Sequence, residues 1–423
     1  MVMTEPDTSV GVASRGPMTA CVLRNYAGLL SYIDAIREAK PVTMENKNRL
    51  SHLDGLRGVA ILFVILFHAY IRWPNIVPYG SEFAGIPVFF YGWAGVQLFF
   101  MISGFVILMT LERCSNIADF MLRRWLRLFP AMAIATVLVC VTAPLLSDRP
   151  AGTIDFKNVV PGLIFIEPGW LNFVFGSHFR ALEGPFWSLF VEVKFYFIFG
   201  ALYFLLGSRR AIAVLFALFA VTAGFKLFMV KHPHAPAAIY WTNFALKRTS
   251  AEHFGWFAAG ALLFQYYQKR AHGILLCATG AAAISILVFN GSHLSEKVPV
   301  ALMALLFFTA ILNDSVQRVL RAKVFLFLGF VSYPLYLIHE DAVVSLIAQL
   351  GRAAPWMPSI LLPALPMVGL VAIAWAVSAK GEPLLRDLLK PVVERASSLG
   401  RSRTDSARGP DDQAKVTKRL RAH

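Results

Sequence analysis

Charged side chains are scarce in this sequence. Of its 423 residues, only 15% are Asp, Glu, Lys or Arg, whereas 57% are hydrophobic and the mean hydropathy is +0.60. A soluble globular protein carries about 25% charged residues. The composition therefore excludes a soluble globular protein and predicts a multi-pass membrane protein.

Cysteine is also scarce. The four residues, Cys21, Cys114, Cys140 and Cys277, lie far apart, form no CxxC pair and have no spacing typical of metal ligands. We therefore expect neither disulfides nor a metal site.

Acidic residues are fewer than basic residues, 25 against 40, which gives a formal charge of +15. Such an excess is also found in nucleic-acid-binding proteins. Here the basic residues cluster between apolar segments and in the tail, as in the cytoplasmic loops of membrane proteins. We expect membrane lipids, and no nucleic acid, as partners.

The first forty-odd residues lack the apolar core of a cleavable signal peptide, since the first strong apolar run begins at Leu56. We expect residues 1–49 to form a cytoplasmic N-terminal extension, with Met44 as an alternative start. Residues 384–423 contain many Lys and Arg among polar residues, and we expect a basic, disordered cytoplasmic tail near anionic lipid.

Ten apolar segments lie between these ends. The predicted spans are residues 56–72, 86–110, 126–146, 186–206, 211–230, 254–267, 273–290, 298–313, 324–346 and 359–379. We therefore predict an all-α fold, a polytopic membrane helix bundle of about ten transmembrane helices over residues 50–383. The links on the same side of the membrane as the N-terminus carry more Lys and Arg per residue than the links on the other side. With an even number of spans, both termini are therefore expected in the cytoplasm. The long outer links 147–185 and 231–253 are expected to cap a substrate-facing cavity.

Three ionisable residues, Asp54, Arg57 and His68, lie in the first span or just before it. At about 100° and about 1.5 Å per residue, Arg57 and His68 share a helix face and are separated by roughly 16 Å. With Arg57 at one membrane surface, His68 lies near the middle of a hydrocarbon core about 30 Å thick, where an ionisable residue indicates a functional site. Asp54 can brace Arg57 as an i,i+3 ion pair. The alternative is an interfacial Arg with a core His bonded to a backbone carbonyl.

The third span opens with a group of arginines. Arg124 and Arg127 are at i,i+3, and Arg123 and Arg127 are at i,i+4, so either pair lies on one side of a helix. Such a group is typical of a positive-inside anchor. Paired guanidiniums beside a cavity also suit a phosphorylated ligand, because each offers bidentate donors to phosphate oxygens.

The fourth span carries a polar stripe in which Ser188, Glu192 and Tyr196 follow one another at i, i+4 and i+8. Glu192 can orient a histidine, bind a sugar hydroxyl, pair with an arginine or make a helix-packing contact. A pairing with Lys194 is disfavoured, because residues two positions apart on a helix point to nearly opposite faces.

The ninth span has a similar polar face. Ser332, Tyr336, His339 and Glu340 lie on it, with His339 and Glu340 toward the outer side. They are either interfacial capping groups or part of a functional site.

Five motifs follow one another along the apolar part of the chain. They are Ser51-His52-Leu53-Asp54-Gly55-Leu56-Arg57-Gly58 leading to His68; Gly95-Val96-Gln97-Leu98-Phe99-Phe100-Met101-Ile102-Ser103-Gly104-Phe105; Arg124-x-x-Arg127-Leu128-Phe129-Pro130; Phe186-Trp187-Ser188-Leu189-x-x-Glu192-x-x-Phe195-Tyr196; and Ser332-Tyr333-Pro334-Leu335-Tyr336-Leu337-Ile338-His339. Their order and spacing, from about residue 50 to 385, resemble the acyltransferase-3 family of integral membrane acyltransferases.

The resemblance implies a bundle of about ten helices that moves an acyl group, often acetyl. The donor would be cytoplasmic acyl-CoA and the acceptor a carbohydrate hydroxyl at the outer face of the bacterial inner membrane. By the family pattern, Arg57 and His68 form the R-x10-H motif, and Arg124 and Arg127 form the R-x-x-R motif.

From these residues we expect a site without a metal. The expected catalytic residues are His68, Arg57 and Glu192. The donor, acetyl-CoA or another acyl-CoA, is expected to bind to Arg57, Arg124 and Arg127. The acceptor, a carbohydrate or glycolipid, is expected to bind to Ser188, Tyr336 and His339. His68 would act either as the base that takes the hydroxyl proton or as the carrier of the acyl group.

Two other functions fit the composition. A transporter or channel would use the buried Arg, His and Glu residues as a proton or substrate relay. A non-catalytic subunit would export acyl groups to a separate enzyme and have no acceptor chemistry of its own. The sequence distinguishes neither the acceptor nor the acyl chain, and it leaves a homo-oligomer open because lipid-facing and self-contacting helix faces look alike.

Overall fold

The computed structural model describes residues 50–232, 236–289 and 294–391, and all regular structure in these ranges is helical. The all-α class is therefore confirmed. The expected extension 1–49 and the tail beyond residue 391 lie outside the described residues, whereas residues 384–391 are helical.

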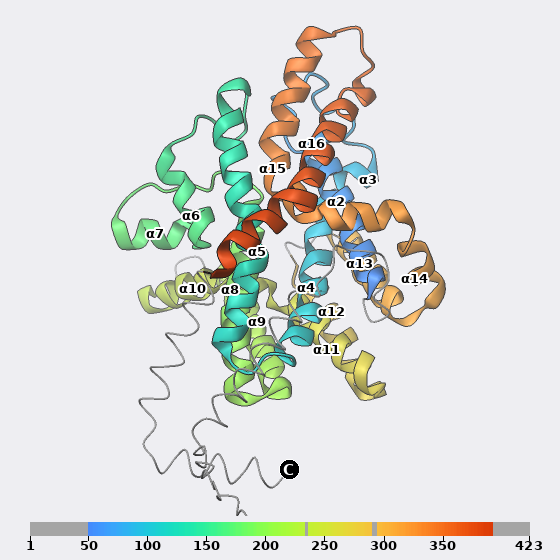
Figure 1. The fold of residues 1–423 in the computed structure, drawn as a ribbon. Helices are drawn as coiled ribbons and strands as arrows, with labels where there is room; N and C mark the ends of the chain where they lie inside the picture. Colours follow the sequence, from blue (N-terminus) through green and yellow to red (C-terminus); the bar gives the residue numbers. More distant parts are fainter. Residues whose placement is uncertain (1–49, 233–235, 290–293, 392–423) are drawn as a thin grey trace, which may run out of the picture. The chain divides into compact units, whose positions relative to one another are not determined.

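The described helices follow one another along the chain as drawn in Figure 1. They are α2 (Ser51–Tyr70), α3 (Pro87–Phe90), α4 (Gly95–Leu111), α5 (Ile117–Thr142), α6 (Val159–Ile164), α7 (Pro168–Phe175), α8 (Phe186–Leu206), α9 (Ser208–Lys231), α10 (Ala237–Thr249), α11 (Phe254–Lys269), α12 (His272–Leu287), α13 (Leu294–Leu312), α14 (Asp314–Leu320), α15 (Lys323–Ala353) and α16 (Ala364–Ala376).

Eight helices of the described residues are long and apolar enough to cross a membrane, fewer than the ten predicted. The two predicted spans that do not qualify, 254–267 and 273–290, correspond to α11 and α12, which have 16 residues each. At about 1.5 Å per residue, 16 residues reach roughly 24 Å, less than a hydrocarbon core of about 30 Å. The chain is a multi-pass membrane protein.

The link predicted at 147–185 is partly helical. It contains α6 and α7, which are bent by 115° at a short break and would count as a ninth span if taken together. Figure 1 shows this bent pair beside α5. We refer to residues 156–175, which contain α6 and α7, as the hairpin.

The close approach of α2 and α15 depends on two glycines. A Cβ atom on Gly58 would collide with the backbone carbonyl of Phe325, and one on Gly329 would collide with that of Asp54. Because glycine has no Cβ atom, the two backbones touch, as in other membrane helix pairs with small residues at the interface. This contact brings Arg57 and His68 of the first span next to the polar face of α15.

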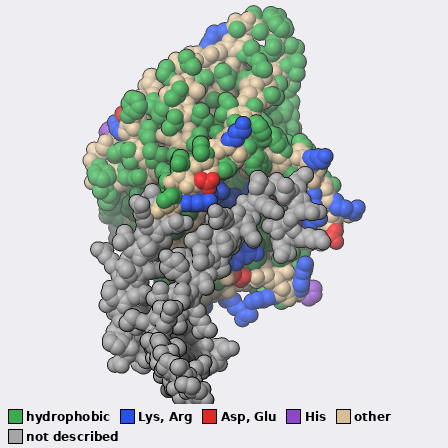
Figure 2. All heavy atoms as spheres, viewed as in Figure 1, with side chains coloured by type: hydrophobic (Ala, Val, Ile, Leu, Met, Phe, Trp, Pro, Cys, Tyr) green, Lys and Arg blue, Asp and Glu red, His purple; other side chains and the backbone are tan. Residues whose placement is uncertain are grey.

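The surface of the described residues is largely apolar. Figure 2 shows hydrophobic side chains over the upper part of the view, while Lys and Arg side chains gather mainly below. Exposed large apolar residues lie on several spanning helices, for example Val141 on α5, Leu205 on α8 and Leu305 on α13. Apolar side chains facing outward from the helices are what a protein in lipid requires.

Candidate active site

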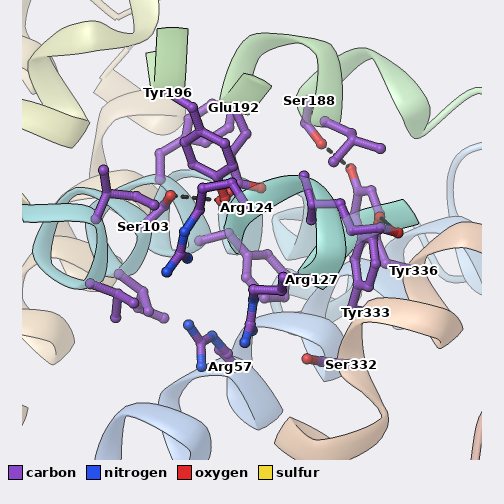
Figure 3. Close-up of a pocket in the computed structure, with 17 residues that line it drawn as sticks. Arg57, Ser103, Arg124, Arg127, Ser188, Glu192, Tyr196, Ser332, Tyr333 and Tyr336 are labelled. Atoms are coloured by element: carbon purple, nitrogen blue, oxygen red, sulfur yellow. Dashed lines mark hydrogen bonds between the residues drawn. The ribbon is translucent and has the colours of Figure 1, made fainter. Parts of the chain in front are cut away.

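A cavity of about 100 Å³ lies between α2, α4, α5, α8 and α15. Figure 3 shows its side chains converging from these helices. Its polar lining residues are Arg57, Ser103, Arg124, Arg127, Ser188, Glu192, Tyr196, Ser332, Tyr333 and Tyr336. We call it the arginine cavity. It unites most of the residues that the sequence predicted for the donor and the reaction.

Arg57 contributes from the second turn of α2. Its Nη1 donates to Oδ1 of Asp54 at 3.1 Å, which confirms the predicted i,i+3 brace. The carboxylate fixes one side of the guanidinium and leaves its other donors free to face the cavity.

Arg124 and Arg127 both line the cavity from α5. This helix begins at a defined point, because the Asn116 side chain accepts a hydrogen bond from the backbone N–H of Asp119 at 2.9 Å. Arg123 faces away and pairs with Asp119 at 2.8 Å. Of the two predicted pairings, the i,i+3 pair therefore forms the cavity wall.

The two cavity arginines keep donors available. Arg124 donates from Nη2 to Thr110 at 2.7 Å, but its buried Nε has no hydrogen-bond partner among the described residues. Arg127 forms no hydrogen bond or ion pair with any residue in the described ranges. In Figure 3 the three guanidiniums point toward the same space. Such an arrangement suits a polyanionic ligand, because bidentate guanidinium–phosphate contacts are strong.

Glu192 lies in the same cavity. Its Oε1 accepts hydrogen bonds from Ser103 at 2.6 Å and from Tyr196 at 2.5 Å, both drawn in Figure 3. The nearby Lys194 instead pairs with Glu167 and also donates to Ser250, at 2.9 Å. The expectation that Glu192 and Lys194 do not pair is therefore confirmed.

Ser188 and Tyr336 close one end of the cavity. Their hydroxyl groups are 2.6 Å apart, and the Tyr336 hydroxyl also lies 3.0 Å from the carbonyl oxygen of Pro185. The Tyr336 ring lies next to the His339 ring, with centroids 5.6 Å apart. Tyr336 therefore links the arginine cavity to a histidine pair behind it.

His68 belongs to this histidine pair and does not line the cavity. It lies in the last turn of α2, which begins at Ser51 and ends at Tyr70. Its Nδ1 is 2.8 Å from the carbonyl oxygen of Val64. A carbonyl only accepts, so we assign the proton to Nδ1 and the lone pair to Nε2.

His339 packs edge-on against His68, with ring centroids 4.8 Å apart. Its Nδ1 donates to the carbonyl oxygen of Tyr336 at 2.9 Å, so its Nε2 carries a lone pair, 3.3 Å from Nδ1 of His68. His339 is fully buried and braces the ring of His68 from the side opposite Glu340.

The carboxylate next to His68 is that of Glu340, not that of Glu192. Oε1 of Glu340 lies 3.5 Å from Nε2 of His68 and accepts a hydrogen bond from the Trp73 indole at 2.8 Å. Glu340 was predicted only as part of the polar face of the ninth span, with no role in the reaction, and Trp73 was not predicted. The signal available for Glu340 was its place between His339 and Asp341, since three successive ionisable residues in an apolar helix are unusual.

A buried ion cluster surrounds Asp341, the residue after Glu340. Nη2 of Arg149 lies 2.7 Å from Oδ2 of Asp341 and 3.8 Å from Oε1 of Glu183. Burial, together with the nearby Asp341 carboxylate, raises the pKa of Glu183 well above that of a free glutamate. No motif in the sequence marks this cluster. Within the described residues, no three His, Cys, Asp or Glu side chains are arranged to hold a metal ion.

Comparisons with known proteins agree with the resemblance of the motifs. A family model described as an acyltransferase domain matches residues 50–379. The "Peptidoglycan O-acetyltransferase OatA" of Listeria monocytogenes is 21% identical over 338 residues, which cover 72% of this chain and 51% of that protein. The "Putative peptidoglycan O-acetyltransferase YrhL" of Bacillus subtilis is 26% identical over 205 residues, which cover 45% of this chain and 30% of that protein.

The chain thus spans about half the length of these relatives, or less. No solved structure matches the chain at a significant level. Because the family model covers most of the chain, from the start of α2 to the end of α16, the chain belongs to the acyltransferase-3 family of membrane proteins.

Proposed function

We propose that this chain is an O-acyltransferase of the bacterial inner membrane, with both termini in the cytoplasm. It transfers an acyl group, in the simplest case acetyl, from cytoplasmic acyl-CoA to a hydroxyl of a carbohydrate or glycoconjugate on the outer face. Membership of the acyltransferase-3 family supports the reaction class, and so do the relatives, which are named as O-acetyltransferases.

The arginine cavity supports the donor side of the proposal. CoA carries a diphosphate and a 3'-phosphate, and these groups need several cationic donors at once. Arg57, Arg124 and Arg127 offer three guanidiniums around one cavity, with donors that no described residue uses. One guanidinium can bind two phosphate oxygens at once, so the three arginines together hold the donor in one orientation.

The tautomer of His68 supports the acceptor side. With Nδ1 bonded to the Val64 carbonyl, the Nε2 lone pair is available to take a proton. In the proposed step, the acceptor oxygen attacks the thioester carbon and the carbon–sulfur bond breaks. His68 takes the hydroxyl proton and passes it to the leaving thiolate. Glu340 then faces the transient imidazolium at 3.5 Å and stabilises it.

Tyr336 lies between the arginine cavity and the histidine pair, and its hydroxyl group pairs with that of Ser188. The acyl-pantetheine arm of the donor, roughly 15 to 20 Å long from its covalent geometry, would pass their hydroxyl pair to bring the thioester to His68. We propose that Ser188, Tyr336 and His339 contact the reacting groups there. Glu192 would hold Ser103 and Tyr196 in place and balance the charge of the arginines.

The observation that carries the proposal is the link through Tyr336 between three cavity arginines and a histidine with a fixed tautomer. The test is mass spectrometry of surface and periplasmic glycans from cells with the gene intact, deleted, and complemented by His68→Ala. Loss of the same acyl mass increment in the deletion and in the variant is expected. Unchanged glycans in all strains, with the variant protein correctly folded, would contradict the proposal.

A further inference from the structure

A second cavity, of about 240 Å³, lies in the link between α5 and α8. Residues 149–158 form one side and residues 178–182 form the other. We call it the loop cavity. The hairpin connects its two sides, so the cavity lies at the base of the hairpin.

The loop cavity carries more positive than negative charge. The charge of Lys157 is paired with Asp155 at 2.9 Å, and that of Arg149 is paired with Asp341 in the buried ion cluster. His178 and Arg180 also line the cavity, and their side chains form no hydrogen bond or ion pair within the described part of the chain. An anionic group would find unused donors here.

Arg149 adds a buried donor to this cavity. Its side chain is only 4% exposed, and its Nε has no hydrogen-bond partner among the residues the structure describes. An unpartnered N–H of a buried guanidinium costs free energy unless a ligand or water satisfies it. Arg149 lines the loop cavity, which makes the cavity a candidate anion site.

The loop cavity is connected to the histidine pair. Asp341 accepts from Arg149 and, at 3.1 Å, from the backbone N–H of Ala151, which also lines the cavity. The next residue toward the N-terminus, Glu340, faces His68. Asp341, which contacts two residues of the loop cavity, is thus the sequence neighbour of the carboxylate that faces the reacting histidine.

The hairpin exposes an apolar surface next to the cavity. Its exposed large side chains include Phe156, Trp170, Phe173, Val174 and Phe175. The base of the hairpin is fixed, because Asn158 accepts from the backbone N–H of Arg180 at 2.8 Å. Asn172 accepts a hydrogen bond from the backbone N–H of Phe179 at 2.6 Å, which ties α7 to the segment 178–182. An apolar face held beside a cationic cavity matches a ligand with a lipid chain and an anionic headgroup.

We infer that the loop cavity binds the phosphate group of a lipid-anchored carbohydrate acceptor, whose lipid chain lies along the hairpin. This inference rests on the proposed function and names the class of its acceptor. Arg149, His178 and Arg180 provide the donors for the phosphate. The sugar next to the phosphate then extends toward Glu340 and His68, where its hydroxyl reacts.

The inference is tested by binding, without acyl transfer. The full chain is placed in phosphatidylcholine nanodiscs, and radiolabelled farnesyl diphosphate serves as a probe with a lipid chain and an anionic headgroup. Farnesol and inorganic diphosphate are the competitors that carry only one of the two features. We expect Arg180→Glu to weaken farnesyl diphosphate binding by about tenfold or more, because a charged hydrogen bond is lost and a like charge is introduced. The matched control Lys297→Glu, on α13 and outside the loop cavity, leaves binding unchanged.

Each outcome separates the inference from the proposed function. Equal binding of the wild type and Arg180→Glu, or loss of binding in Arg124→Lys alone, would place the probe in the arginine cavity and overturn the inference. Competition by farnesol or inorganic diphosphate as strong as by the unlabelled probe would also overturn it. Binding that depends on Arg180, in a protein that releases no CoA thiol from acetyl-CoA with any acceptor, would support this site while contradicting the proposed function.

Discussion

Nε2 of His68 lies 3.5 Å from Oε1 of Glu340, while Nδ1 of the same ring is held by the Val64 carbonyl. The nitrogen that is free to take a proton is thus the one beside the carboxylate. The Trp73 indole fixes this carboxylate from the other side at 2.8 Å. The arrangement resembles an acid–base pair more than a structural salt bridge, since one ring nitrogen stays available.

The first prediction concerns the charge of Glu340. Glu340→Gln keeps the shape of the side chain but removes the negative charge that stabilises an imidazolium at His68. We expect kcat to fall by about tenfold to a hundredfold with little change in KM for acyl-CoA, because the donor binds elsewhere. The measurement is CoA thiol release in detergent-purified protein. Glu252→Gln makes the same chemical change at a half-exposed carboxylate paired with Lys226 and is expected to leave kcat unchanged.

The second prediction separates the two neighbouring arginines of α5. Arg124→Lys retains the charge in the cavity but loses the planar donor pair and the bond to Thr110. We expect KM for acyl-CoA to rise about tenfold while kcat changes little. Arg123→Lys is the control, because Arg123 is exposed and pairs with Asp119 outside the cavity. Equal effects of both substitutions would show that general positive charge, not cavity geometry, binds the donor.

The sequence predicted the helices and the faces of their polar residues well, because helical periodicity is a local property. The i,i+3 pairing of Asp54 with Arg57 and the shared face of Arg124 and Arg127 follow from spacing alone, and both are found. The cavity that unites Arg57 with Glu192 was not predicted, because spacing within one helix says nothing about which helices meet.

Contacts between distant helices were not predictable in this way. Trp73 and Glu340 are 267 residues apart in sequence, and Arg149 and Asp341 are 192 residues apart. Periodicity gives the face of a helix but not the rotation and depth at which two helices meet. The described residues contain eight or nine candidate spans where about ten were predicted, since α11 and α12 are apolar but stop after 16 residues each.

The third prediction uses the raised pKa of Glu183. The folded protein binds this proton more tightly than the unfolded chain, because the buried carboxyl lies beside Asp341. The carboxyl therefore contributes most to stability below its unfolded pKa, near 4.5, and the contribution falls as pH rises toward the folded pKa. We expect the thermal unfolding midpoint to decline as the pH rises above about 4.5. Glu183→Gln, which stays neutral, should flatten that decline. Glu82→Gln, at an exposed carboxylate before α3, should keep the slope of the wild type.

The fourth prediction tests the packing that brings the two halves of the site together. Gly58→Ala adds a Cβ atom that collides with the backbone carbonyl of Phe325, so α2 must move away from α15. Backbone atoms cannot swing aside as a flexible side chain does, and we expect a loss of stability of about 1–3 kcal/mol. The same shift separates His68 from Glu340, so acyl transfer should fall together with the unfolding midpoint.

Gly224→Ala provides the matched control for this prediction. Gly224 lies within α9, and a Cβ atom built there meets no other atom within 4 Å. Replacing an open helical glycine by alanine stabilises a helix by about 0.5–1 kcal/mol, because the unfolded chain loses conformational freedom. A Gly58→Ala protein as stable and as active as Gly224→Ala would mean that α2 and α15 need not touch at this point. The contact between His68 and Glu340 would then have to be held by Trp73 and His339 alone.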